Sequence, residues 1–177
     1  SSTIRDAALN NADLTHSQWS SNYAYIVDTT RPTVSRVAIS GQNGMQNNFL
    51  NYSDTLDMTV TFNEVYPSAV IVSGTPTLTF VMGSTNIGST NRTATYTSGD
   101  DTTPSSVNDN ASLVFDYEIK GTGTSGENDD DGISFGTSVL NSNSITIKDR
   151  AGNIATNLSN SAVPDNPSYK VDTIRPH

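Results

Sequence analysis

The residues with the clearest chemical capacity in this sequence are carboxylates that fall in expected loops, singly, in pairs and in one short run. Calcium binds about six to eight oxygen ligands from carboxylates, amides and backbone carbonyls. The chain has 18 acidic and 9 basic residues and a formal net charge of −9, and bound cations would relieve that repulsion. The candidate calcium ligands are Asp28, Glu64, Asp100, Asp101, Asp109, Glu127, Asp129, Asp131, Asp149 and Asp172.

The first expected site combines Asp28, Glu64 and Asp149. Asp28 lies in the run Val-Asp-Thr-x-Arg-Pro, which returns 144 residues later around Asp172. Asp149 also has an earlier counterpart, Asp6, in a second repeated segment. A metal ligand at a module junction would be repeated in this way. The alternative is that Asp28 caps a turn in a Thr/Pro linker and that Asp149 only stabilises a loop.

The second expected site combines Glu127, Asp129 and Asp131. Residues 129–131 are three consecutive aspartates, which repel one another unless they are solvated or bound to a cation. Gly132 follows this run, but no Glu stands at the position that an EF-hand requires. The alternative is a solvated acidic loop.

Several other functions are disfavoured. A Ser-His-Asp relay has almost no candidate base, because His16 and His177 are the only histidines. Paired carboxylates could hydrolyse glycosides, but no aromatic-lined cleft accompanies them, so we expect no enzyme. We expect no nucleic-acid partner, which would need clustered Lys and Arg, and no membrane insertion, which would need about 18 consecutive apolar residues. The chain has no cysteine, so calcium could take the place of a disulfide.

The elements that position these residues are expected to be strands. Two-residue alternation of apolar and polar side chains is widespread, and helical periodicity is nearly absent. Loops rich in Gly, Asn, Asp and Ser separate the alternating segments. The pattern predicts an all-β chain, an immunoglobulin-like antiparallel β-sandwich of about seven strands with long acidic loops. The expected strands are 34–40, 56–62, 76–82, 92–97, 113–119, 144–148 and 169–171.

Strands of alternating direction would sort the candidate ligands onto two ends of the fold. One end should receive Asp28, Glu64, Asp100, Asp101, Asp109, Asp149 and Asn153. The opposite end should receive Asp54, the run 127–131 and Asp172.

The repeated segments also predict the domain boundaries. Residues 1–32 are interpreted as the C-terminal part of a preceding repeat plus its linker, residues 33–172 as one module, and residues 173–177 as the start of the next linker. An isolated two-stranded remnant is marginally stable in water. We therefore expect residues 1–27 to dock on the main module or to be ordered only at their linker end.

Several motifs occur in order along the chain, and together they are more specific than any one alone. They are residues 27–32, 59–64, 74–78, 92–96, 113–117, 131–134 and 147–153. This series resembles the immunoglobulin-like repeats of giant bacterial RTX adhesins, which are exported by type I secretion. The resemblance covers residues 27–176, and the tail of the same pattern covers residues 1–27.

The resemblance implies an extracellular module on a bacterial cell surface that binds calcium, often at the junction with adjacent repeats of the same chain. Extra residues at 98–111 and around 120–131 lengthen this copy, and it also resembles the peptide-binding modules of ice-binding and cholera-type adhesins. We expect a calcium-dependent adhesion module that engages a protein or peptide on another cell surface. The alternative is a calcium-rigidified extender without a ligand of its own. A concave, partly apolar site would favour binding, and a smooth surface would favour the extender.

Overall fold

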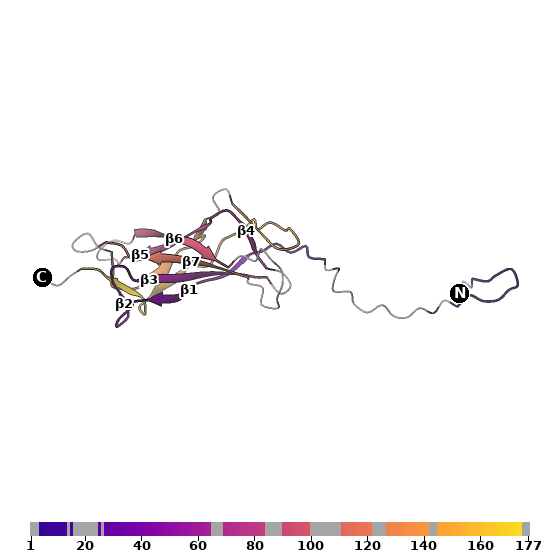
Figure 1. The fold of residues 1–177 in the computed structure, drawn as a ribbon, viewed down its shortest axis with the longest axis horizontal. Helices are drawn as coiled ribbons and strands as arrows, with labels where there is room; N and C mark the ends of the chain where they lie inside the picture. The colour runs from indigo at the N-terminus through magenta and orange to yellow at the C-terminus, as the bar shows by residue number, and fades with distance from the viewer. Residues whose placement is uncertain are drawn as a thin grey trace.

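The fold is all-β over the part of the chain that the structure describes. The computed structural model describes residues 4–13, 15, 25, 27–64, 69–83, 90–99, 111–121, 127–141 and 145–174. No helix occurs in these ranges, and accordingly none is long and apolar enough to cross a membrane. Figure 1 shows the strands gathered into one body, which we define as residues 34–172.

The described residues form thirteen strands. These are β1 (Val34–Asn43), β2 (Phe49–Leu50), β3 (Thr55–Phe62), β4 (Ile71–Ser73), β5 (Thr77–Met82), β6 (Thr90–Ser98), β7 (Ser112–Glu118), β8 (Asn128–Asp129), β9 (Ile133–Phe135), β10 (Leu140–Asn141), β11 (Thr146–Lys148), β12 (Val163–Asn166) and β13 (Lys170–Asp172). Each of the seven expected segments overlaps one of them, namely β1, β3, β5, β6, β7, β11 and β13.

Most of these strands belong to one large sheet. Its order is β1-β3-β7-β6-β5-β9-β12, with β10 also paired to β5. Two small sheets, β11-β4 and β2-β13-β8, complete the body. The pairings are antiparallel except that β13 runs parallel to β2.

The core forms where alternation is strict. In β3, every second side chain from Leu56 to Phe62 is buried, and β5 repeats the pattern from Leu78 to Met82. Successive side chains of a strand point to opposite faces, so this spacing places one apolar face inward. Phe80 is fully buried, and its ring meets Tyr117 edge-on with 4.9 Å between centroids. The long strands therefore form because their apolar faces share one core.

The expectation of about seven strands undercounts the short ones. The six additional strands, β2, β4, β8, β9, β10 and β12, contain two to four residues each. Such lengths are too short to show a two-residue period. These strands form because adjacent segments of the same chain offer partners for their backbone hydrogen bonds. They matter for function because β2 and β4 lie at opposite ends of the body (Figure 1).

The N-terminal residues 4–12 form a separate small hairpin. Arg5 and Asn11 make its isolated bridge, and the N–H of Ala12 donates to the carbonyl of Ile4 at 2.8 Å. The side chains of Ile4 and Leu9 are 63% and 71% exposed. Docking of residues 1–27 on the main module stays a prediction.

Candidate metal site

Asp28 is held in place by the linker that leads into β1. Its Oδ1 accepts the backbone N–H of Thr30 at 2.9 Å, which makes the local turn that a short acidic side chain favours. Beyond this turn, Arg31 donates to the hydroxyl of Thr156 at 3.2 Å, and Pro32 is buried against the body. The linker therefore presents Asp28 at the end of the body near β4, which we call the linker end.

Glu64 reaches the same end from β3. The strand ends at Phe62, and the N–H of Asn63 donates to the carbonyl of Thr33 at 2.8 Å, so the two chain segments stay side by side. Glu64 is half-buried, and its Oε1 is buried without a hydrogen-bond partner among the described residues. Burial, followed by the charges of Asp149 and Asp28, raises the pKa of the Glu64 carboxyl.

Asp149 follows β11 and is fully buried. Asn153 fixes it: the backbone N–H of Asn153 donates to Asp149 Oδ1 at 2.8 Å, and its Nδ2 donates to Asp149 Oδ2 at 2.7 Å. The same Nδ2 donates to the backbone carbonyl of Asp28 at 3.1 Å. Gly152 takes a φ of +92° in this turn, a backbone conformation that suits glycine. Asn153 thus joins the linker to the loop after β11.

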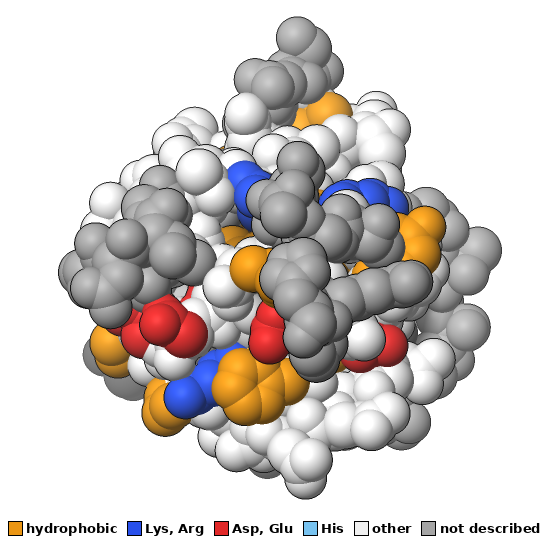
Figure 2. Space-filling model, turned by 90° about the vertical axis from the view of Figure 1, so that its left-hand side faces the viewer, with side chains coloured by type: hydrophobic (Ala, Val, Ile, Leu, Met, Phe, Trp, Pro, Cys, Tyr) orange, Lys and Arg blue, Asp and Glu red, His pale blue; other side chains and the backbone are white. Residues whose placement is uncertain are grey.

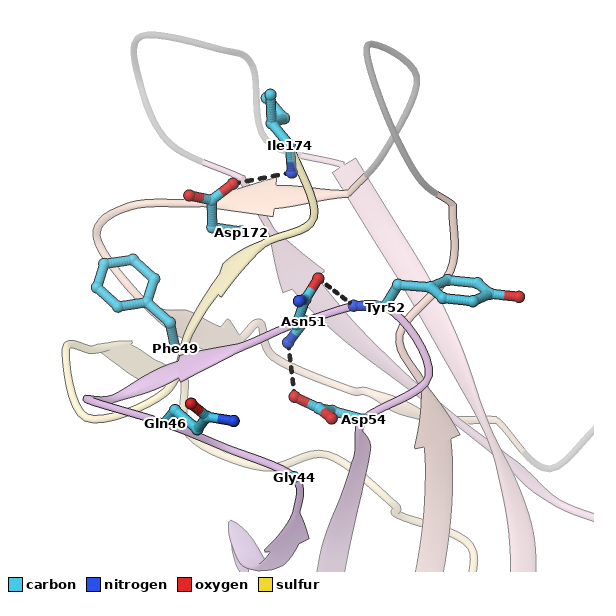
Figure 3. Close-up of a pocket in the computed structure, with 8 residues that line it drawn as sticks. All are labelled: Gly44, Gln46, Phe49, Asn51, Tyr52, Asp54, Asp172 and Ile174. Atoms are coloured by element: carbon cyan, nitrogen blue, oxygen red, sulfur yellow. Dashed lines mark hydrogen bonds between the residues drawn. The ribbon is translucent and has the colours of Figure 1, made fainter. Parts of the chain in front are cut away.

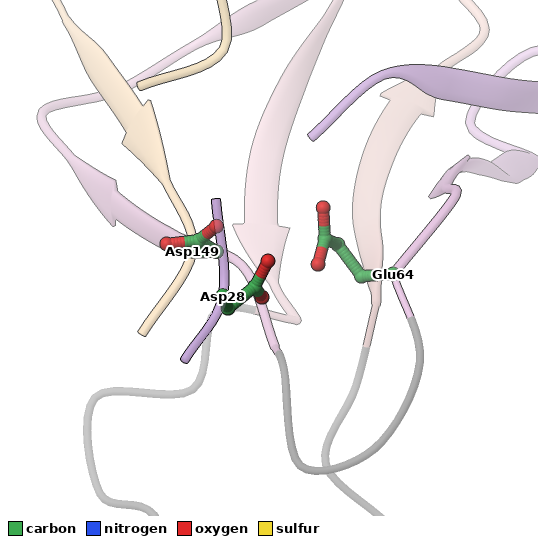
Figure 4. A group of neighbouring side chains, drawn as sticks. All are labelled: Asp28, Glu64 and Asp149. Carbon is green, nitrogen blue, oxygen red and sulfur yellow. The ribbon is translucent and has the colours of Figure 1, made fainter. Parts of the chain in front are cut away.

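The three carboxylates converge. Asp28, Glu64 and Asp149 each offer an oxygen, and these three oxygens lie within 4.8 Å of one another. Figure 4 shows Asp28 and Asp149 facing Glu64 across a common space. Among the described residues this is the one group of three acidic, histidine or cysteine side chains with such spacing. The grouping expected from strand direction is therefore present for these residues.

A group of this kind is electrostatically unfavourable without a proton or cation. At 4.8 Å, two unit charges repel by about 3 kcal/mol if the effective dielectric constant is about 20. Three ionised carboxylates make three such pairs, and water does not reach Asp149, which is fully buried, while Asp28 and Glu64 are partly buried. Oxygen ligands alone and a charge of −3 match the chemistry of a hard divalent cation. The cluster could hold a metal ion.

The repeated segments have the same local structure. In the N-terminal hairpin, Asp6 Oδ1 accepts the N–H of Asn10 and Asn10 Nδ2 donates to Asp6 Oδ2, both at 2.9 Å, which repeats the contacts of Asp149 with Asn153. Asp172 Oδ1 accepts the N–H of Ile174 at 2.9 Å, which repeats the turn at Asp28. Each repeated segment forms the same turn at both of its positions in the chain. The turns therefore depend on the local sequence and not on the surroundings.

Glu127 lies apart from this cluster and makes a different set of contacts. It forms an ion pair with Arg92, and its Oε1 accepts the hydroxyl of Tyr117 at 2.5 Å. The N–H of Lys120 donates to Oε2 at 2.8 Å. Burial, reinforced by Glu127, raises the pKa of the Tyr117 hydroxyl. Glu127 is therefore engaged by protein partners on both oxygens, and its expected role as a metal ligand stays a prediction.

Asp129 and Asp131 lie close to each other, and Asp129 belongs to β8, the strand beside β13. Asp129 is fully buried and accepts the N–H groups of Gly83 at 3.0 Å and Gly132 at 2.5 Å. Burial is the main cause that raises its pKa, and Asp131 raises it further. Asp129 pairs with Val171 in the ladder between β8 and β13. The acidic run thus pairs through its backbone with β13, the last strand of the body.

The remaining candidates separate by location. Asp172 is the last residue of β13, which pairs with β2 at the end of the body opposite the cluster, and Asp54 lines the same cavity as Asp172. This is the sorting that alternating strand directions predict. Asp100, Asp101 and Asp109 lie outside the described residues. Sequence reasoning placed Asn153 at the linker end but missed that it joins Asp28 to Asp149; the signal was its counterpart Asn10.

Comparisons with protein-family models, with curated proteins and with solved structures found no match for this chain.

Proposed function

We propose that this chain is a calcium-dependent module of a bacterial cell-surface adhesin, folded as an immunoglobulin-like β-sandwich. The single observation that carries the proposal is the convergence of Asp28, Glu64 and Asp149 at the linker end. The order of motifs along the chain, which resembles RTX adhesin repeats, supports the family and the extracellular location.

Calcium is the favoured ion because of the ligand chemistry. The three side chains offer only carboxylate oxygens, whereas zinc sites in proteins use mostly His and Cys. Calcium also tolerates irregular geometry and accepts backbone carbonyls and water as further ligands. Asp28, Glu64 and Asp149 would hold the ion, and the ion would supply the positive charge that this cluster lacks.

The position of the cluster indicates what binding would achieve. Asp28 belongs to the linker, Glu64 follows β3, and Asp149 follows β11. A shared ion would therefore connect three segments that are distant in the sequence. It would hold the linker against the body and set the angle at which an adjacent module of the same chain projects.

Two roles fit such a module, and we propose the ligand-binding one. In this role the module engages a protein or peptide on another cell surface, and a cavity at the far end of the body supports it. The placement of the metal cluster at the linker favours the alternative, an extender that calcium only makes rigid. No hydrolytic role is proposed.

Thermal unfolding with calcium and with a chelator tests the proposal. The wild-type midpoint should rise in calcium, and Glu64→Gln or Asp28→Asn should remove about half of the rise or more. Asp165→Asn is a matched control, because Asp165 is an exposed aspartate in β12. An equal rise in the wild type and in a combined Asp28→Asn/Glu64→Gln variant would exclude this cluster as the calcium site.

A further inference from the structure

The body carries a cavity of about 400 Å³ at its C-terminal end, the end opposite the metal cluster. It is formed by the loop between β1 and β2, the turn between β2 and β3, and the residues that follow β13. In Figure 2, which views this end of the molecule, acidic, basic and hydrophobic side chains all lie on the surface. The lining of the cavity itself combines carboxylates with large apolar side chains.

Exposed apolar side chains supply part of the cavity wall. Phe49, Tyr52 and Ile174 line it and are 40%, 51% and 42% exposed. Phe49 and Tyr52 come from β2 and the turn after it, while Ile174 comes from the far end of the module sequence. Large side chains gathered at a concavity are typical of a binding surface rather than of scattered surface residues.

Two carboxylates are held in fixed positions within the same cavity. Asp54 Oδ2 accepts the N–H of Asn51 at 2.7 Å, and Asp172 Oδ1 accepts the N–H of Ile174 at 2.9 Å. Figure 3 shows these two carboxylates on opposite sides of Asn51. Gly44 allows Asp54 to come close, because a Cβ at that position would lie only 1.9 Å from Asp54 Oδ1. The acceptors are thus arranged before any partner binds.

Among the residues that the structure describes, those that line the cavity include no cation. None of the lining residues that the structure describes is Lys or Arg, in a chain of net charge −9. The Lys170 ammonium lies 5.7 Å from the centroid of the Phe49 ring, so this ring already has a cation of the chain over its face. The two carboxylates of the cavity, Asp54 and Asp172, are the groups that would attract an incoming cation.

The geometry points to this cavity as the site for a Lys or Arg side chain of a partner polypeptide. An anionic group, including a peptide C-terminus, would meet Asp54 and Asp172 without a compensating charge. A purely apolar group would remove both carboxylates from water without a partner. A guanidinium or ammonium on its alkyl stem satisfies the carboxylates and packs against the apolar wall.

This inference rests on the proposed function, because it names the partner chemistry of an adhesion module. It does not depend on the calcium cluster, which lies at the other end of the body. The two can therefore fail separately.

The test is a titration of the full chain, saturated with calcium, followed by backbone amide shifts in NMR. The probes are N-acetyl-arginine methylamide, N-acetyl-lysine methylamide and the uncharged N-acetyl-citrulline methylamide. The cationic probes should shift amides of residues 44–54 and 172–174 saturably at millimolar concentration. Citrulline, which has nearly the shape of arginine without its charge, should bind at least about tenfold more weakly, since hydrogen bonds to charged groups are the stronger ones.

Variants complete the test. Asp54→Asn and Asp172→Asn preserve an oxygen for the turn and should each weaken the cationic probes about tenfold. Asp165→Asn should leave probe affinity unchanged. Equal binding of citrulline, no effect of the cavity variants, or calcium shifting the same amides and displacing the probe would each overturn the inference. Glu64→Gln should alter the calcium-dependent melt without altering probe binding, which distinguishes failure of this inference from failure of the calcium proposal.

Discussion

Glu64→Gln should have opposite effects on stability with and without calcium. In the absence of calcium, the substitution removes two of the three carboxylate repulsions in the cluster. Each repulsion is about 3 kcal/mol at an effective dielectric constant of about 20. Solvent screening of the half-exposed Glu64 and its raised pKa reduce the effect, so we expect a net stabilisation of about 1 kcal/mol. This corresponds to a midpoint about 2–4 °C higher for a chain of this size.

In saturating calcium the wild type should be more stable than Glu64→Gln. A ligand present at about 100 times its dissociation constant stabilises the folded state by about 2.7 kcal/mol. Losing one carboxylate ligand should weaken the affinity for calcium by at least about tenfold, which removes about 1.4 kcal/mol of that gain. The variant should then melt at or below the wild-type temperature.

The pH dependence provides a further check of the same reasoning. The pKa of Glu64 is raised in the folded state, so the folded chain binds more protons than the unfolded chain between the ordinary Glu pKa and the raised one. The calcium-free wild type should therefore gain stability at this residue as pH falls through that window. Glu64→Gln should lack that part of the gain.

Differential scanning calorimetry of the wild type, Glu64→Gln and Asp165→Asn would measure these effects. Both variants remove one negative charge, so a general effect of net charge would move them together. If Glu64→Gln lowered the midpoint in chelator and preserved the full gain in calcium, the three carboxylates would not form one site.

Three other substitutions test separate parts of the structure. Asn153→Ala should weaken calcium binding and loosen the linker, because it removes the donor shared by Asp149 Oδ2 and the Asp28 carbonyl; calcium titration calorimetry that showed unchanged affinity would contradict this. Asp57→Asn should stabilise the chain by up to about 1 kcal/mol at neutral pH, since burial and the cross-strand Asp116 raise the pKa of Asp57. That gain should shrink as pH falls through the raised pKa towards the ordinary Asp value, and a pH-independent gain in urea unfolding would refute the electrostatic cause. Phe80→Ala should cost about 3–5 kcal/mol in the same assay, because the ring is fully buried; a loss below about 1 kcal/mol would show that the core refills the space.

Strand prediction succeeded where a strand has its own apolar face. The alternating residues of β3 and β5 mark these strands in the sequence because their buried faces are four and three side chains long. A strand such as β8 has no such mark, since Asn128 and Asp129 are polar and its partner is β13. Its existence depends on which backbone groups the folded chain brings beside it.

The candidate site likewise has features that the sequence predicts and features that it does not. Strand direction was sufficient to predict that Asp28, Glu64 and Asp149 lie at one end. The end at which a loop lies depends only on how many strands separate it from the other loops. The contacts of Glu127 were not predictable, because Arg92 and Tyr117 reach it from β6 and β7 across the fold. Acidic residues that look alike in sequence thus differ in their partners.

The sequence by itself determined the all-β class, the long strands and the repeated turns at Asp6, Asp28, Asp149 and Asp172. These depend on local alternation and on hydrogen bonds over two to four residues. Only the tertiary structure decided which carboxylates converge, which accept hydrogen bonds from glycine backbones, and where a cavity opens between β2 and the end of β13. Those outcomes depend on distances between segments that are remote in the chain, and such distances are set by packing of the shared core.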